Sequence, residues 1–146
     1  MNKVLVINGP NLNLLGAREK NIYGEKTLEE INKMLLDEAD KLGIEVGFVQ
    51  SNHEGVIIDT IHEAKGKYDA IIINAGAYTH YSYAIRDAIK AVDIPAVEVH
   101  LSNIYSREDF RCKSVIAPVC KGQISGFGYN SYIVALIAVI TEYFKK

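Results

Sequence analysis

The chain has 146 residues, of which 49% are hydrophobic and 23% charged. This ordinary globular composition argues against a disordered or collagen-like chain and predicts one domain over residues 1–146. The 16 Lys and Arg residues against 18 Asp and Glu residues give a formal net charge of −2. A nearly balanced charge gives no electrostatic footprint for nucleic acid or an anionic membrane, and no apolar stretch is long enough to span a bilayer. We therefore expect neither partner.

The sequence shows neither a signal-peptide pattern nor a cysteine motif. The apolar run Val4–Ile7 is too short for the apolar region of a signal peptide, and no small-residue cleavage site follows it. Cys112 and Cys120 have a spacing that fits neither CxxC redox chemistry nor a zinc site, so we expect reduced thiols. The sequence predicts a cytoplasmic protein.

Strand and helix signals alternate from the first residues onward. After an apolar strand and a long loop, Thr27 and Glu30 match a capping box at the start of a helix that Gly43 ends. The elements predicted in this half are a strand at Val4–Ile7, a loop at Asn8–Lys26, a helix from Leu28 to Leu42, a strand at Ile44–Val49 and a helix at Val56–Ala64.

The alternation continues to the end of the chain. The elements predicted in the second half are strands at Ala70–Ile73, Pro95–Val99 and Gln123–Ile124, helices at Tyr81–Val92 and Ser131–Phe144, and one helical turn at Glu108–Cys112. Strands that are apolar on both faces and alternate with helices indicate a parallel sheet covered by helices. We predict a flavodoxin-like α/β fold of three layers, with a five-stranded parallel sheet in the order 2-1-3-4-5.

In such sheets ligands bind at the carboxyl ends of the strands, near the point between the first and third strands where the order reverses. The segments that leave these ends, residues 8–24, 74–80 and 98–103, bring together several amides with His80, His100, Glu98, Ser102, Arg18 and Tyr23. They contain neither a GxxxxGK[ST] phosphate loop nor a GxGxxG fingerprint. Glu98 and His100 could share a strand face, but no third metal ligand is apparent, so we predict no metal.

Two pairs suggest proton chemistry. His100 at a strand end has the chemistry of a general acid, and Glu98 could orient its ring; the alternative is a His that only packs at the sheet edge. Tyr23 could act as a base if the guanidinium of Arg18 stabilised its phenolate; the alternative is a solvated loop.

Other polar residues suggest a binding role. Asn11 and Asn74 suit the binding of hydroxyls, although Asn is also a common turn residue. Ser102 and the nearby backbone amides could hold a carboxylate. Residue chemistry alone thus indicates a small, polar, anionic ligand and proton transfer, and it does not identify the molecule.

Six ordered motifs go further, because together they resemble the type II 3-dehydroquinate dehydratases over essentially the whole chain. They are Asn8–Leu12, Gly16–Gly24, Gln50–Gly55, Asn74–His80, Arg86-Asp87, and Glu98–Asn103 with Arg107–Arg111. The resemblance implies loss of water from 3-dehydroquinate to give 3-dehydroshikimate, with no cofactor, metal or imine. The chain departs from the family pattern at Lys20, Ala75, Tyr81, Tyr83 and Thr60, none of which is a catalytic position.

The resemblance also implies a role for each site residue. Tyr23 would remove the C2 proton, Arg18 would stabilise its phenolate, and Asn11 would stabilise the enolate through a bound water. His100, oriented by Glu98, would protonate the leaving C1 hydroxyl. The residues that would bind substrate are Asn74, His80 and Arg111 at the ring hydroxyls, Leu101 and Ser102 at the carboxylate, and Asp87 from a neighbouring subunit.

Assembly and rival functions complete the expectations. The resemblance implies a homo-oligomer, a dodecamer built from trimers. One alternative is a flavodoxin-like FMN-binding protein, which would need a hydroxyl-rich loop after the first strand, whereas Asn8–Gly16 has no Ser or Thr. Another is a scaffold without activity, in which Arg18, Tyr23 and His100 would not all be expected to persist.

Overall fold

The computed structural model describes residues 2–17 and 19–144 and contains one sheet of five parallel strands. The strand order is β2-β1-β3-β4-β5, which confirms the predicted topology. The strands are β1 (Lys3–Asn8), β2 (Glu45–Gln50), β3 (Ala70–Asn74), β4 (Ala96–His100) and β5 (Gly122–Ser125).

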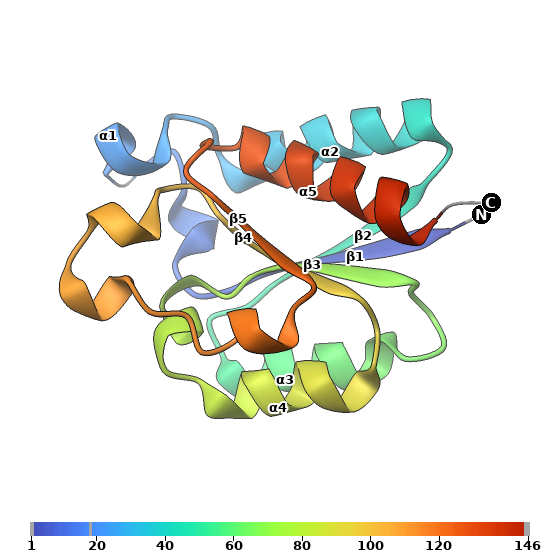
Figure 1. The fold of residues 1–146 in the computed structure, drawn as a ribbon. Coiled ribbons are helices and arrows are strands. Elements are labelled where there is room, and N and C mark those ends of the chain that lie inside the picture. Colours follow the sequence, from blue (N-terminus) through green and yellow to red (C-terminus); the bar gives the residue numbers. More distant parts are fainter. Residues whose placement is uncertain (1, 18, 145–146) are drawn as a thin grey trace.

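Helices cover both faces of this sheet (Figure 1). The long helices are α2 (Leu28–Leu42) and α5 (Asn130–Tyr143) on one face, and α3 (Glu54–Ala64) and α4 (Tyr83–Val92) on the other. Successive strand residues point to opposite faces, so Val4 and Val6 pack with α2 and α5, whereas Leu5 and Ile7 pack with α3 and α4. The result is the predicted three-layer arrangement with a core on each side of the sheet.

Local signals set the helix boundaries. The hydroxyl of Thr27 accepts from the amide of Glu30, and the Glu30 carboxylate accepts from the amide of Thr27, so the predicted capping box is confirmed. Helix α4 begins at Tyr83, two residues after the predicted start. The reason is that Ser82 caps the helix by accepting from the amide of Ile85 at 3.1 Å.

Short turns connect the longer elements, and the turn at Asp109–Arg111 lies within the helical turn predicted at Glu108–Cys112. Residues 8–26 contain the 3₁₀ turn η1 (Leu12–Leu14) and the four-residue helix α1 (Lys20–Tyr23), both too short to produce a periodic apolar pattern. The other 3₁₀ turns are η2 (Gly76–His80), η3 (Ile104–Ser106), η4 (Asp109–Arg111) and η5 (Ala117–Val119). Across the described residues, no helix has the length and apolar character needed to cross a membrane.

Candidate active site

A pocket opens at the carboxyl ends of β1, β3 and β4, where the strand order predicts a ligand site. Eight of the predicted site residues line it: Asn11, Tyr23, Asn74, His80, His100, Leu101, Ser102 and Arg111. The wall is completed by residues that sequence reasoning had not assigned to the site: Pro10, Leu12, Gly76, Ala77, Ile104 and Arg107.

Three predicted residues stand apart from that wall. Arg18 lies outside the described residues. Glu98 lies behind the wall, where it is fully buried and contacts His100. Asp87 is exposed on α4 and does not line the pocket of its own subunit.

Two neighbouring loops approach closely to form the floor of the pocket. Gly9 donates its amide to the carbonyl of Asn74 at 2.7 Å, and a Cβ at Gly9 would lie 2.5 Å from the carbonyl oxygen of Ala75. Only glycine fits at this contact. Asn11 follows in the left-handed region, with φ of 69°, a conformation that Asn tolerates better than most residues. Its amide donates to Oδ1 of Asn52 at 3.0 Å, which fixes the turn.

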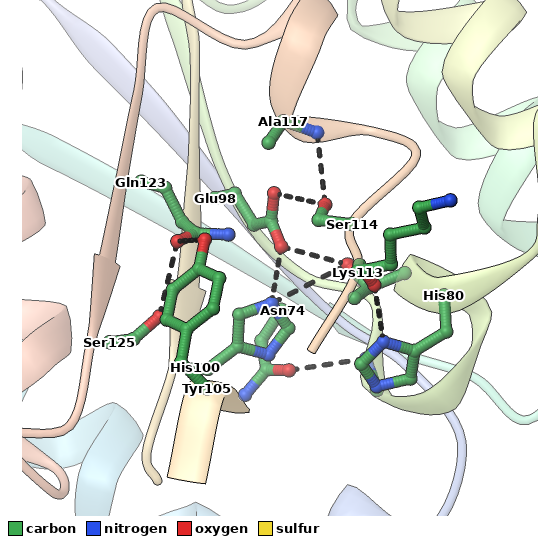
Figure 2. A network of polar contacts seen from close by, with 12 residues as sticks. Asn74, His80, Glu98, His100, Tyr105, Lys113, Ser114, Ala117, Gln123 and Ser125 are labelled. Carbon is green, nitrogen blue, oxygen red and sulfur yellow. Dashed lines mark hydrogen bonds and ion pairs between the residues drawn. The ribbon is translucent and has the colours of Figure 1, made fainter. Parts of the chain in front are cut away.

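Glu98 and His100 form a buried pair on β4 (Figure 2). Nε2 of His100 bonds Oε2 of Glu98, and the same oxygen accepts from the hydroxyl of Thr79 at 3.0 Å. Oε1 accepts from the hydroxyl of Ser114 at 2.7 Å. Burial raises the pKa of Glu98, but the hydrogen bonds and charge of His100, with the bonds from Ser114 and Thr79, bring it below its usual value. Glu98 is therefore a carboxylate at neutral pH.

This arrangement orients the His100 ring. Because the Glu98 carboxylate accepts a proton-bearing nitrogen, Nε2 carries hydrogen, and Nδ1 is the nitrogen that remains for proton exchange with a ligand. The ring is 6% exposed, so it reaches the pocket through a small part of its surface. The pair has the geometry of a general acid with a fixed orienting carboxylate.

His80 has a different environment. Its Nδ1 lies 2.7 Å from the carbonyl of Lys113, which can only accept, so Nδ1 carries hydrogen. Burial lowers the pKa of His80, and the charges of His100 and Arg111 lower it further, against the opposing effect of the Lys113 bond. His80 is thus a neutral ring at pH 7, with Nε2 free of a proton and able to accept a hydrogen bond.

Asn74 ends β3, and its amide is fixed from behind. Nδ2 donates to the hydroxyl of Tyr132 at 3.0 Å, and Oδ1 accepts from the amide of Gly76 at 3.1 Å. Tyr132 in turn donates to Oδ1 of Asn8 at 2.5 Å. Burial raises the pKa of Tyr132, so its hydroxyl keeps its proton. Asn74 therefore both stabilises a turn and lines the pocket, and its second Nδ2 hydrogen is left for a ligand.

Arginines from the segment after β4 complete the wall. The guanidinium carbon of Arg107 lies 5.3 Å from the centre of the Tyr23 ring, and its Nη1 lies 3.5 Å from the Ser102 hydroxyl. Nε of Arg111 lies 3.2 Å from Oε1 of Glu108. Sequence reasoning had placed Arg107 in a family motif without giving it a role. Only the fold shows that it contacts Tyr23, which lies 84 residues earlier.

In the described part of the chain, no group of three or more His, Cys, Asp or Glu residues could hold a metal ion. The polar groups that converge on the pocket are suited instead to proton transfer and to the binding of hydroxyls and a carboxylate.

Known proteins resemble this chain over nearly its whole length. The family model for class II dehydroquinases matches residues 2–140. The 3-dehydroquinate dehydratase of Caldicellulosiruptor bescii is 69% identical over 140 residues, which are 95% of this chain and 97% of that protein. The crystal structure of type II dehydroquinase from Butyrivibrio crossotus matches with a TM-score of 0.93 and 55% identity, covering 94% of this chain and 97% of the other. The crystal structure of type II dehydroquinase from Propionibacterium acnes matches with a TM-score of 0.94 and 38% identity, covering 97% of this chain and 98% of the other. The chain therefore belongs to the class II dehydroquinase family.

Proposed function

We propose that this pocket removes water from 3-dehydroquinate through an enolate, with Tyr23 as the base and His100 as the acid. Membership of the family makes the chain a 3-dehydroquinate dehydratase of the type that uses neither a metal nor a Schiff base. The observation that carries the mechanism is that Tyr23 and the Glu98-held His100 belong to one pocket. The family match decides against the FMN-binding alternative.

The first step takes the C2 proton, which is acidified by the neighbouring ketone. Tyr23 serves as a phenolate, and two guanidinium groups are proposed to stabilise it: Arg18, on the same segment, and Arg107, whose charge lies over the ring. The electrons of the C2–H bond form a double bond to the ketone carbon, and the π electrons of the carbonyl move to its oxygen, which gives an enolate. Asn11, which lines the pocket, is proposed to stabilise this charge through a bound water.

The second step expels the C1 hydroxyl. His100 gives the proton on Nδ1 to that oxygen, the C1–O bond breaks, and water leaves. The enolate electrons return to form the C1–C2 double bond, conjugated with the ketone, in 3-dehydroshikimate. The Glu98 carboxylate, bonded to Nε2, fixes the direction of the ring.

Substrate binding uses the rest of the wall. We assign the carboxylate to the amide of Leu101 and the hydroxyl of Ser102, and the ring hydroxyls to Asn74, His80 and Arg111. All five line the pocket. A neutral His80 and the spare hydrogen on Asn74 supply an acceptor and a donor, respectively, which is the pairing that hydroxyl groups require.

Asp87 is proposed to act in the pocket of a neighbouring subunit, in trimers that assemble into a dodecamer. Its exposed position on α4 supports this role, because the side chain does not enter its own pocket. Tyr81 and Tyr83, near the start of the same helix, are 58% and 64% exposed. Large exposed aromatic residues are typical of protein interfaces.

The mechanism is tested by adding 3-dehydroquinate and following the ultraviolet absorbance of the enone product. Tyr23→Phe should bind substrate without turnover, and Arg18→Ala should lose nearly as much activity, because both act on one proton transfer. The double variant should be no worse than Tyr23→Phe alone. Tyr105→Phe, which removes a hydroxyl bonded to Gln123, is the matched control and should keep full activity. Substantial turnover by Tyr23→Phe would assign the base to another residue.

A further inference from the structure

The carboxylate of Glu98 is held by more than its catalytic neighbour. It is fully buried, and each of its oxygens accepts from a hydroxyl: Oε1 from Ser114 at 2.7 Å and Oε2 from Thr79 at 3.0 Å. An ionised carboxylate in an apolar interior is costly unless hydrogen-bond donors replace the water that it has lost. These two hydroxyls supply that replacement.

Backbone hydrogen bonds hold the Ser114 hydroxyl and tie its segment to the turn that carries Thr79. The oxygen of Ser114 accepts from the amide of Ala117 at 3.0 Å, which directs its single hydrogen toward Glu98 (Figure 2). Val115 donates its amide to the carbonyl of Thr79 at 2.8 Å. The segment that carries Ser114 is therefore fastened to the turn that carries Thr79, and the two donors form one rigid clamp around Glu98.

We propose that Ser114 and Thr79 are positioning residues for the reaction: their hydroxyls hold the buried Glu98 carboxylate ionised and aimed at His100. The proposal rests on the acid role proposed for His100. Thr79 also lies 3.5 Å from Nε2 of His100, so it limits where the Glu98 oxygen and the ring can meet. Without the clamp, Glu98 would keep only the bond to His100 and would hold its charge less readily.

The turnover test uses Ser114→Ala and Thr79→Val, which each remove one donor. We expect kcat to fall about tenfold or more, as for loss of a hydrogen bond to a charged group, with KM changed less than about twofold. Thr79→Ser retains the hydroxyl and should restore most of the rate. Ser125→Ala is the matched control. Ser125 lies on β5 opposite His100, but its hydroxyl donates to Gln123 and not to Glu98. Failure of Thr79→Ser to restore the rate would overturn the proposal, and so would a normal kcat in both donor variants combined with a change in stability that does not depend on pH.

A pH readout separates positioning from simple packing. The pKa of Glu98 is depressed in the folded protein, so its contribution to stability is present above about pH 4.5 and is lost as the pH falls through the folded value. Ser114→Ala should raise that pKa toward its ordinary value. The urea midpoints of parent and variant should therefore differ most near neutral pH and converge in acid. The acid limb of the plot of kcat against pH should move to higher pH in the variant.

The other titratable groups that face Glu98 are His100, His80 and Cys120. Burial and the charge of Glu98 raise the pKa of the Cys120 thiol to about 12, so this thiol stays neutral over the pH range of the experiment. Ser114→Ala leaves both histidines and Cys120 in place, so the comparison between the two proteins reports the loss of the hydroxyl that donates to Glu98. A difference in midpoint that is the same at every pH would mean that Ser114 only packs, which would overturn the proposal. A pH-dependent difference with normal kcat supports the clamp and instead counts against the acid role of His100.

Discussion

The buried chain Asn8–Tyr132–Asn74 gives a prediction whose size follows from the structure. Tyr132 is fully buried, and Asn8 and Asn74 are 1% and 3% exposed. Tyr132→Phe keeps the ring but removes the hydroxyl that donates to Asn8 and accepts from Asn74. The side-chain oxygen of Asn8 and one side-chain amide hydrogen of Asn74 are then left without a partner, in a place where water does not replace the lost hydroxyl.

Each of the two orphaned buried groups costs about 1–3 kcal/mol, so the variant should lose about 2–6 kcal/mol of unfolding free energy. For a chain of this size that corresponds to a fall in Tm of roughly 4–24 °C. The released Asn74 amide should also bind substrate less well, which raises KM more than it lowers kcat.

Urea unfolding at a fixed protein concentration measures the loss, because oligomer stability depends on concentration. Tyr143→Phe, on the same helix and 40% exposed, is the matched control and should unfold like the parent. A Tyr132→Phe variant as stable as this control would refute the reasoning, since it would show that the two amides find other partners at no cost.

Two further predictions concern the acid and the assembly. His100→Ala should lower kcat by about 10²–10⁴ with little change in KM, the usual size of general acid catalysis, and steady-state kinetics with a kcat equal to that of the parent would show that His100 only packs. Asp87→Asn and Tyr23→Phe should each be nearly inactive alone, yet oligomers assembled from a mixture of the two should regain activity, because some pockets then pair an intact Tyr23 with an intact Asp87 from a neighbour. No recovery in mixed oligomers, with exchange verified by light scattering and mass spectrometry, would place Asp87 outside the neighbouring site.

Much of the fold was predictable because its signals are local. The capping pair Thr27 and Glu30 and the terminal Gly43 set the ends of α2, and uninterrupted apolar runs marked the buried strands. The start of α4 was predicted two residues early, because periodicity extends through Tyr81 whereas the Ser82 cap determines where the helix begins. Helix α1 was missed, since four residues carry no periodicity.

The site was predictable to the extent that its residues follow strand ends. Glu98 and His100 are two positions apart on one strand, so their pairing could be inferred from alternation alone. The contacts of Arg107 with Tyr23, and of Ser114 and Thr79 with Glu98, join segments that are distant along the chain. No spacing rule encodes such contacts, and they emerge only when the loops fold over the sheet.

The central claim is that one pocket divides the reaction between a base, Tyr23, and an acid, His100. Exchange of the C2 proton of 3-dehydroquinate in D₂O, followed by NMR alongside product formation, tests it most directly. His100→Ala should still exchange this proton for deuterium while forming little product, because the enolate forms but the hydroxyl leaves slowly. Tyr23→Phe should neither exchange nor dehydrate. Exchange by Tyr23→Phe at the rate of the parent would contradict the account, because the proton would then be leaving through another residue.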